Sequence, residues 1–363
     1  MLSIGIVGCG DVAYRHYVPA LESMKDEVQI AAVSDPRSDA ARQLAQRVST
    51  WSGEPRVFTE LDAMLRSVHL DGVFNLTPAP AHGAVNRMIL AAGVPTYSEK
   101  PVASTVADAN ELIDLASQRQ TLFLCAPGSA VSGRVRWLRS IAESRRLGNP
   151  TLAVAHHADP GPADWLEYSG DPTPFYQQGV GPVFDHGVYR LHEMTAVLGP
   201  VALVQAMGAI ALPEREVRGG PLTGQTIAVT TQDHVLMHLK FESGALGQLL
   251  ASFATADTLS PWLEMHFERG VVSFGGKSWD SEVPISIFDA TLGAEGGSWQ
   301  RVTDMPRDDG DVVEAGATHF IRCLLRQQAP VLTAEHARHV LEVILAAYQS
   351  IESGRAVEVT TRF

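Results

Sequence analysis

Three side chains with acid–base chemistry recur at helical spacing in the second half of the chain. Asp185, Tyr189 and His192 stand at positions i, i+4 and i+7, so a helix would present all three on one face. A carboxylate, a phenol and an imidazole on one face offer a proton acceptor and hydrogen-bond partners for a hydroxyl group. The alternative is a helix with a polar solvent-facing side, on which the tyrosine serves packing.

A second candidate for chemistry is Lys100, which follows the strand-like segment 95–98 and precedes Pro101. This segment is expected to be a buried strand, so Lys100 would lie at its carboxyl end, where open α/β sheets bind ligands. Proline fixes φ and stiffens the backbone directly after the lysine. The alternative is an ordinary surface lysine.

The start of the chain carries a dinucleotide-binding pattern. A short apolar run leads into Gly8, Gly10 and Ala13, which are spaced G-x-G-x-x-A. Gly8 permits a sharp turn, Gly10 lets a pyrophosphate approach the backbone, and Ala13 lets the next helix pack on the strand. Asp11 and Val12 begin that helix, whose free N–H groups attract phosphate. The alternative is a tight strand–helix turn without a ligand.

An acidic residue follows the glycines at the distance that dinucleotide binding requires. Asp35 ends the apolar run 28–34, about 20 residues beyond the turn, where it can accept hydrogen bonds from ribose hydroxyls. Its carboxylate would repel a 2′-phosphate, so NAD is the predicted cofactor. Arg37 could bind that phosphate instead, which keeps NADP open. No metal is predicted, because the histidines show no ligand spacing and the pair 156–157 would point to opposite faces of a strand.

Together these groups suit hydride transfer between an alcohol and a ketone, which needs a base and a stabilised oxyanion. Tyr189 is the predicted proton acceptor, alone or with Lys100, because an adjacent ammonium and oxidised nicotinamide would lower the phenol pKa from ~10. Asp185 is expected to hydrogen-bond a substrate hydroxyl or to orient Lys100. The remaining substrate-binding candidates, for which a structural role fits as well, are His192, Trp165 and Tyr176.

The elements that must position these residues follow from periodicity. Strands and helices alternate through residue 125, which predicts a doubly wound parallel sheet and an NAD(P)-binding Rossmann domain over 1–125. A helix is expected over 11–24, and Thr59 with Asp62 resembles a capping box. The remainder, 126–363, is expected to be an α+β domain with a large, mostly antiparallel sheet that binds substrate and mediates oligomerisation. Two further expectations concern the helix 182–198 and the Gly- and Asp-rich surface loop 293–310.

Composition restricts the functional class. A chain of 363 residues favours about two domains, and its formal net charge of −13 argues against nucleic acid or an anionic membrane as partner. The three cysteines lie far apart and show neither metal nor disulfide spacing. The first apolar stretch is broken by glycines and follows no basic segment, and no run approaches membrane-spanning length. These features predict a cytoplasmic protein that acts on a small molecule.

Four motifs, taken in order, resemble the Gfo/Idh/MocA oxidoreductase family. They are G-I-V-G-C-G-D-V-A-Y-R-H at 5–16, T-P-A-P-A-H at 77–82, S-E-K-P at 98–101 and D-H-G-V-Y-R-L-H at 185–192. The resemblance covers essentially the whole chain. It implies NAD- or NADP-dependent chemistry on sugars, polyols or related compounds, and an open-faced sheet that forms a homodimer or homotetramer. It also implies cofactor contacts at Thr77, Pro78, His82, Glu99 and Lys100.

Departures from the family pattern refine this expectation. The helix usual in the family reads D-x-G-x-H-x-x-D. In this chain Tyr189 replaces its histidine and His192 replaces its final aspartate. The tyrosine is similar to the branch that includes glucose–fructose oxidoreductase and dimeric dihydrodiol dehydrogenase. Ala79 replaces the usual asparagine, and Val180 interrupts the glycine-rich lead-in. The predicted function is a dehydrogenase or reductase of a sugar-like CH–OH group. The alternatives are a redox-neutral epimerase, eliminase or glycoside-cleaving enzyme with tightly held NAD, and a catalytically silent dinucleotide-binding regulator.

Overall fold

The computed structural model describes residues 1–276, 284–292, 296–304 and 311–363, which form two compact units. Unit 1 contains residues 1–132 and 308–341 with Phe363, and unit 2 contains 133–307 and 342–362. The expected boundary after residue 125 differs from this division, because α8 (Val312–Leu324) and the first part of α9 (Ala334–Ser353) return to unit 1. Among the described helices, none combines the length and the apolar character needed to cross a bilayer.

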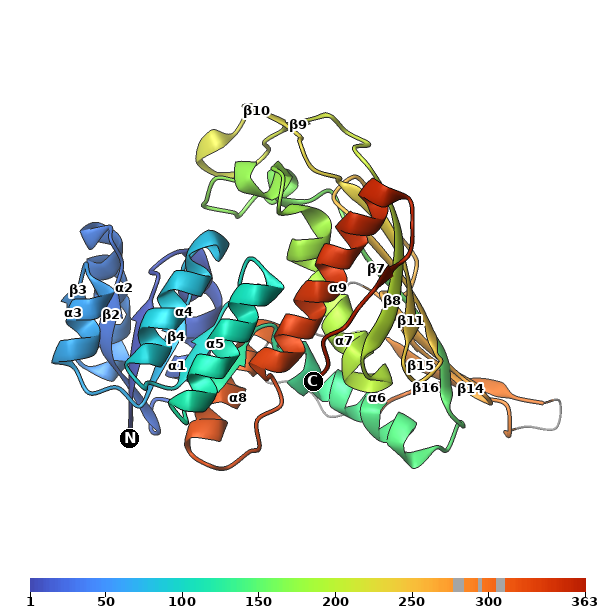
Figure 1. The fold of residues 1–363 in the computed structure, drawn as a ribbon, viewed down its shortest axis with the longest axis horizontal. Helices are drawn as coiled ribbons and strands as arrows, with labels where there is room; N and C mark the ends of the chain where they lie inside the picture. The colour runs from blue at the N-terminus through green and yellow to red at the C-terminus, as the bar shows by residue number, and fades with distance from the viewer. Residues whose placement is uncertain (277–283, 293–295, 305–310) are drawn as a thin grey trace. The chain divides into compact units, whose positions relative to one another are not determined.

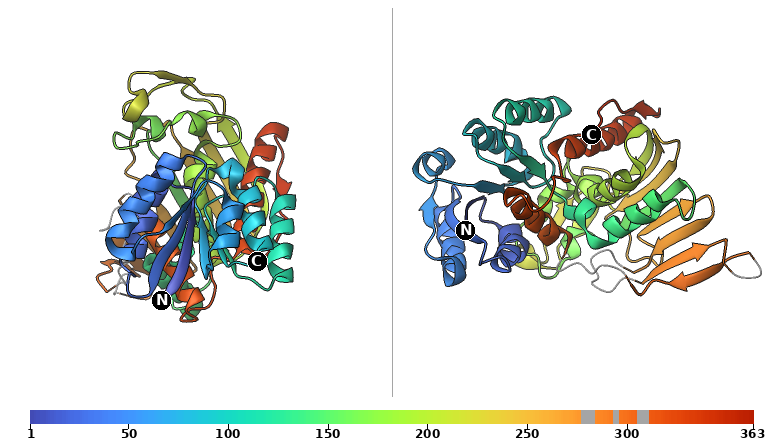
Figure 2. Two further views of the ribbon diagram at one scale, coloured as in Figure 1. Left: turned by 90° about the vertical axis from the view of Figure 1, so that its left-hand side faces the viewer. Right: turned by 90° about the horizontal axis from the view of Figure 1, so that it is seen from below.

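Unit 1 is built on six parallel strands in the order β3-β2-β1-β4-β5-β6, and helices cover both faces of the sheet (Figures 1 and 2). The strand order reverses beside β1, which places the ligand-binding switch point at the carboxyl ends of β1 and β4. The predicted Rossmann sheet is therefore confirmed. Its strands are β1 (Leu2–Val7), β2 (Val28–Ser34), β3 (Arg56–Phe58), β4 (Gly72–Asn75), β5 (Thr96–Ser98) and β6 (Phe123–Cys125). Its other helices are α1 (Val18–Glu22), α2 (Ser38–Ser52), α3 (Leu61–Ser67), α4 (His82–Ala91) and α5 (Val106–Gln118).

The helix starts of unit 1 differ in two respects from the sequence prediction. The Thr105 side chain accepts a hydrogen bond from the backbone of Asp108, as expected of an N-cap. The capping box predicted at Thr59 is wrong, because α3 begins after an extended Glu60 and has no side-chain cap. The helix predicted over 11–24 is interrupted, since a π-helical turn, η1 (Ala13–Tyr17), precedes α1.

An aromatic cluster ties α8 to the sheet of unit 1. The rings of Tyr17, Phe74, Tyr97 and Phe320 lie 5.1–6.0 Å apart and belong to η1, β4, β5 and α8, respectively. All four side chains are fully buried. Edge-to-face pairs of this kind add about 0.5–1.5 kcal/mol each beyond the area they bury. Residues distant in the sequence therefore complete the core on which the glycine turn rests.

Unit 2 contains a nine-stranded sheet in the order β16-β15-β14-β13-β7-β12-β11-β8-β17. Only β7 and β12 pair in parallel within this sheet, so the predicted, mostly antiparallel α+β fold is confirmed. The sheet strands are β7 (Pro150–Ala158), β8 (Val201–Ala209), β11 (His234–Phe241), β12 (Leu246–Ser252), β13 (Leu263–Phe267), β14 (Gly270–Phe274), β15 (Ile285–Asp289), β16 (Ser298–Arg301) and β17 (Val357–Glu358). A separate pair joins β9 (Glu214–Glu216) to β10 (Thr226–Ala228).

Two predictions for unit 2 are corrected by the structure. The stretch 293–310, expected to be a loop, contains β16, while 293–295 and 305–310 fall outside the described residues. The helix expected over 182–198 begins with a second π-helical turn, η6 (Val183–Gly187), before α7 (Val188–Leu198). The other long helix of this unit is α6 (Gly133–Ser144).

A buried ion pair fixes α7 inside unit 2. Arg190 and Glu193 lie within 2.7 Å of each other, and each is only 2% exposed. The Arg190 guanidinium also lies 4.3 Å from the ring centroid of Trp262, an attractive cation–π contact. Burial alone disfavours the charged form of both side chains, and their mutual attraction offsets part of that cost.

Candidate functional site

The glycine turn after β1 has the shape that a dinucleotide requires. Gly8 has φ +90°, and a Cβ there would lie 2.5 Å from the carbonyl oxygen of Leu76. A Cβ at Gly10, by contrast, would meet no atom within 4 Å, so the space above this backbone is open. Ala13 is fully buried where η1 packs on the sheet. Asp11 and Val12 lie at the start of that helical segment. The chain therefore leaves room for a pyrophosphate at the position that the sequence predicts.

Asp35 lies beside the glycine turn, and its carboxylate is held by three donors. The backbone N–H groups of Cys9 and Arg37 each donate over 2.9 Å, and the Arg37 guanidinium adds longer contacts of 3.2 and 3.3 Å. Burial opposes ionisation of Asp35, but hydrogen bonds from Arg37 and Cys9 outweigh it and lower the carboxyl pKa. Asp35 is therefore an ionised acceptor. The Arg37 side chain is 67% exposed, so its contact with Asp35 is open to exchange.

Glu99 connects the glycine turn to Lys100. Its carboxylate accepts a hydrogen bond of 2.6 Å from the Tyr17 hydroxyl on η1 and one of 2.8 Å from the backbone N–H of Lys100. Glu99 is 8% exposed, and the Lys100–Pro101 peptide is cis. The glutamate of the S-E-K-P motif thus positions the backbone of the lysine. Lys100 itself is half-buried at the carboxyl end of β5, as its place in the sequence predicts.

His82 joins the other two loops at this edge of the sheet. Its ring nitrogens lie 2.7 Å from the carbonyl oxygens of Thr77 and Pro101, and the side chain is 1% exposed. The Thr77 hydroxyl donates to Asn75 over 2.6 Å, so the turn that contains Thr77 and Pro78 is held from both ends. His82 therefore holds the shape of the T-P-A-P-A-H loop, and its predicted cofactor contact remains a prediction.

The three candidates of unit 2 lie on η6 and α7 and are all buried. Asp185, Tyr189 and His192 are 9%, 6% and 3% exposed. The π-helical turn lies between Asp185 and the regular helix, so the α-helical spacing that predicted one shared face does not extend to Asp185. The Tyr189 ring lies 6.4 Å from the ring of His157 on β7. Helical distortions of this kind are frequent at functional sites.

The two aromatic candidates of the 161–176 segment have different environments. Trp165 is partly exposed and stacks on His186 at a centroid distance of 5.6 Å, so it lies beside the residue that follows Asp185. Tyr176 is fully buried against Phe253 and accepts a hydrogen bond from the backbone of Ala163. Burial raises the pKa of Tyr176 to about 12. The ring of Tyr176 belongs to a core cluster of unit 2, which favours its structural role, and its predicted substrate contact remains a prediction.

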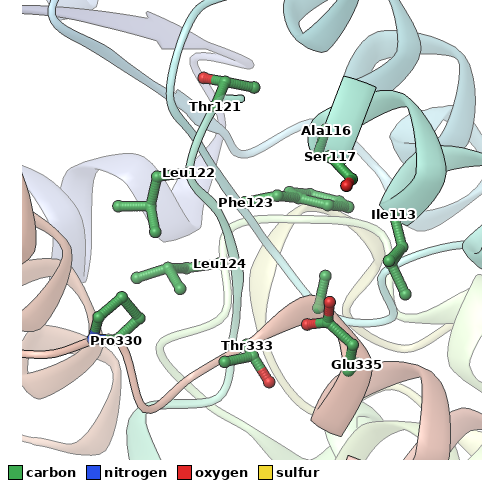
Figure 3. A pocket seen from close by; sticks show the side chains of 11 residues that line it. Ile113, Ala116, Ser117, Thr121, Leu122, Phe123, Leu124, Pro330, Thr333 and Glu335 are labelled. Atoms are coloured by element: carbon green, nitrogen blue, oxygen red, sulfur yellow. The ribbon is translucent and has the colours of Figure 1, made fainter. Parts of the chain in front are cut away.

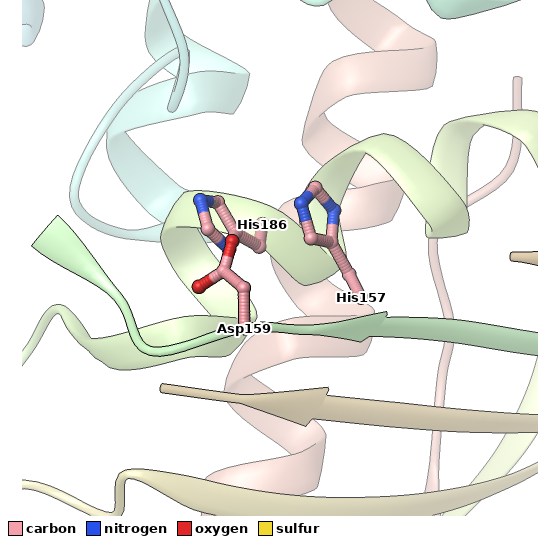
Figure 4. A group of neighbouring side chains, drawn as sticks. All are labelled: His157, Asp159 and His186. Carbon is pink, nitrogen blue, oxygen red and sulfur yellow. The ribbon is translucent and has the colours of Figure 1, made fainter. Parts of the chain in front are cut away.

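The sequence analysis missed a cluster beside these candidates. His157, Asp159 and His186 place their polar atoms within 4.8 Å of one another (Figure 4). His157 is buried and His156 is partly exposed on the opposite side of β7, as the strand alternation predicts. The only sequence signal for this cluster was the position of His186 inside the D-H-G-V-Y motif. The chain order gives no indication that the end of β7 meets η6.

A cavity of about 210 Å³ lies elsewhere in unit 1 (Figure 3). It follows the edge strand β6 and includes Ile113, Phe123, Pro330 and Glu335. None of the candidate residues lines it. Its walls come from α5, β6 and the segment before α9, so it belongs to the packing of the sheet edge.

Comparison with known protein families agrees with this geometry. Residues 2–126 match the model of the GFO/IDH/MocA oxidoreductase family described as an NAD-binding Rossmann fold, and residues 135–273 match the GFO/IDH/MocA C-terminal domain. The chain belongs to the GFO/IDH/MocA oxidoreductase family, as its motifs predict. Its N-terminal domain is accordingly an NAD-binding domain, and the protein is an NAD(P)-dependent oxidoreductase.

Individual relatives place the chain among enzymes of sugar chemistry. It is 28% identical over 231 residues to dTDP-3,4-didehydro-2,6-dideoxy-alpha-D-glucose 3-reductase of Streptomyces violaceoruber, a match that covers 62% of each chain. It is 24% identical over 366 residues to D-glucoside 3-dehydrogenase of Escherichia coli, covering 98% of this chain and 97% of that one. The structure of levoglucosan dehydrogenase has the same fold, with a TM-score of 0.82, 17% identity and 99% coverage of both chains.

Proposed function

We propose that the protein oxidises a secondary alcohol of a sugar, glycoside or polyol with NAD, or reduces the corresponding ketone. The observation that carries this proposal is the Glu99 bridge. One carboxylate holds both the helix that follows the glycine turn and the backbone of Lys100. A lysine fixed at the carboxyl edge of an NAD-binding sheet is suited to stabilise an alkoxide while hydride is transferred. The names of the relatives supply the substrate class, because they act on glucosides and deoxysugar ketones.

The residues of unit 1 fit the cofactor. The open backbone at Gly10 receives the pyrophosphate, and the ionised Asp35 accepts from the ribose hydroxyls. NAD supplies the hydride acceptor when bound. The Arg37 guanidinium is held against Asp35 and is thereby withheld from a 2′-phosphate, which together with repulsion by Asp35 favours NAD over NADP.

The residues of unit 2 supply proton chemistry and substrate contacts. Tyr189 takes the hydroxyl proton in the oxidation direction, Asp185 accepts a hydrogen bond from the substrate, and Trp165 offers an aromatic face to a sugar ring. Lys100 acts in the same reaction by stabilising the oxyanion. His192 is buried on the same helix as Tyr189, where it would bind a substrate hydroxyl or help to position Tyr189.

The exposed face of the large sheet supports a homodimer or homotetramer. Leu236 of β11 pairs across the ladders with Met207 and Leu250, and Met207 is 75% exposed. Leu246 of β12 is also 53% exposed. Apolar side chains in register on one open face are typical of an association surface. The three free cysteines fit a reducing cytoplasm, and burial, with Asp35 nearby, raises the pKa of Cys9 to about 12.

The function is tested by screening sugars, glycosides and polyols with NAD and NADP, using the absorbance of the reduced cofactor. With a substrate in hand, Lys100→Ala and Tyr189→Phe should each lower kcat by about two to four orders of magnitude without changing the melting temperature. Lys25→Ala is the matched control, because Lys25 is an exposed lysine of the same unit as Lys100. Normal turnover by Tyr189→Phe would show that the phenol is structural. A substrate consumed with no net change in absorbance would identify a redox-neutral reaction.

A further inference from the structure

His186 lies between two carboxylates within unit 2. Its Nε2 atom is 3.4 Å from Oδ2 of Asp185, and its Nδ1 atom is 3.5 Å from Oδ2 of Asp159, which follows β7. Figure 4 shows the Asp159 carboxylate directed at the His186 ring. The imidazole side chain is only 3% exposed. Each ring nitrogen therefore lies within ion-pair distance of its own acid, so an imidazole with its hydrogen on Nδ1 has the lone pair of Nε2 on the side of Asp185.

The three side chains differ in exposure, with the imidazole the most enclosed and Asp159 the most exposed. Asp185 is 11% exposed, His186 is 3% exposed and Asp159 is 31% exposed. One carboxylate is thus enclosed with the candidate catalytic residues, while the other reaches water. A buried imidazole that joins an enclosed acid to a solvent-exposed acid has the arrangement of a proton path.

Other rings enclose the imidazole of His186. His157 stacks on it at a centroid distance of 3.9 Å and an angle of 16°, and Trp165 lies nearly parallel to it at 5.6 Å. Phe253 meets the ring edge-to-face at 5.1 Å. Aromatic faces within about 6 Å of a cation attract it. Three rings and two carboxylates therefore surround the imidazole.

The same geometry argues against a shared metal ion. His157, Asp159 and His186 have the ligand types that divalent metals bind. The lone pair of an imidazole nitrogen lies in the ring plane, and a metal sits about 2.0–2.1 Å along it. Two ring planes stacked 3.9 Å apart at 16° do not converge on one such point. Joint coordination would require one ring to turn out of the stack.

We propose that Asp185, His186 and Asp159 form a proton relay between the catalytic residues and solvent; this inference rests on the proposed function. Oxidation breaks one C–H and one O–H bond. The hydride and its electron pair go to NAD, and the proton taken up by Tyr189 passes on to Asp185. Asp185 gives that proton to Nε2 of His186 as Nδ1 releases its own proton to Asp159, which passes it to water. Each transfer makes and breaks one bond to hydrogen, and no oxidation state changes.

The other charged or titratable groups around His186 leave this path intact. His157 on β7 and Tyr189 on α7 lie on the side of the catalytic candidates, and their rings are 6.4 Å apart. Arg215 of β9 donates to the carbonyl of Phe253 and pairs with Asp164, so its charge is already compensated. The acids that face the His186 nitrogens are therefore Asp159 and Asp185.

The kinetic test uses Asp159→Asn and His186→Gln with His156→Gln as control. His156 lies on the opposite side of β7, where its Nδ1 atom is 3.1 Å from the carbonyl oxygen of Pro261. At low buffer concentration, each relay variant should lose about tenfold or more in kcat for oxidation, with KM and melting temperature unchanged. Added imidazole buffer should restore part of that loss, because it carries protons in place of the relay. The control should behave as the unmodified protein.

A second measurement needs no substrate. In protein labelled with ¹⁵N-histidine, one ring should show a hydrogen on Nδ1 and none on Nε2, and its signals should vanish in His186→Gln. Asp159→Asn should shift that hydrogen to Nε2, which lies beside the remaining carboxylate. If no sugar is turned over but these signals appear, the proposed function fails while the acid–imidazole–acid arrangement stands.

Three results would overturn the relay. The first is full kcat in Asp159→Asn at every buffer concentration. The second is a hydrogen on Nε2 of His186 in the unmodified protein, which would leave no lone pair to accept a proton from Asp185. The third is a divalent metal bound at one equivalent and lost in His157→Ala, which would show that the cluster is a metal site. A loss of activity in His186→Gln that comes with a lowered melting temperature and no rescue by imidazole would also count against it.

Discussion

Gly8 and Gly10 are two residues apart, and the structure predicts opposite consequences for adding one methyl group to each. At Gly8, φ of +90° costs an alanine about 1–2 kcal/mol, and the Cβ would lie 2.5 Å from the Leu76 carbonyl oxygen. Relieving that overlap in a packed core adds about 1–3 kcal/mol. Gly8→Ala should therefore destabilise unit 1 by about 2–5 kcal/mol. For a unit of this size, that corresponds to a fall in melting temperature of about 4–20 °C.

Gly10→Ala should leave the fold unchanged and block the cofactor. No protein atom lies within 4 Å of the added Cβ, so the melting temperature should not fall. The methyl group would occupy the space that the pyrophosphate needs, and NADH affinity should drop at least about tenfold. Thermal unfolding without cofactor and NADH fluorescence titration measure the two effects separately. Undiminished NADH binding by Gly10→Ala would refute the assignment of this turn as the pyrophosphate site.

Two further predictions concern charged pairs of unit 1. Asp35→Ala removes the ribose acceptor and releases Arg37, so NADH affinity should fall by about 10–100-fold while NADPH affinity rises, as paired fluorescence titrations would show. The second pair is His16 and Asp311, which lie 2.6 Å apart. The hydrogen bond to Asp311 raises the pKa of His16. Burial opposes ionisation of Asp311, but its hydrogen bonds, the one with His16 first, lower the pKa of this carboxyl group. The pair of protonated His16 and ionised Asp311 therefore stabilises the folded protein between pH ~4 and ~6.5, and this stabilisation is lost as pH rises through the folded-state pKa of His16. His16→Gln should lower the melting temperature at pH 5.5 more than at pH 8.5, and an equal effect at both values would contradict the pairing.

The sequence predicted the elements whose pattern is local. The strands of unit 1 and the opposite faces of His156 and His157 on β7 follow from residue type and spacing over a few positions. The Thr59 cap failed because Glu60 adopts the extended conformation and α3 begins one residue later. The return of residues 308–341 to unit 1 depends on long-range packing such as Phe320 against Phe74 and Tyr97, which no local pattern contains.

The candidate site shows the same division between local and long-range information. Lys100 was predictable because its motif and its strand are contiguous, but Glu99 gains its role only when Tyr17, 82 residues away, donates to it. Tyr176 was an equally good aromatic candidate in the sequence, and only its burial against Phe253 separates it from Trp165.

The surroundings of His186 depend most strongly on contacts between distant segments. This histidine lies between Asp185 and Gly187, and the helical pattern of this segment does not predict which side chains surround it. The π-helical turn and the end of β7 together place an acid at each of its ring nitrogens. Because neither acid pairs with His186 through a recognisable spacing, a proton path of this kind is visible only in three dimensions. The chemistry of the site thus depends on where strand β7 ends as much as on the motif that marks the helix.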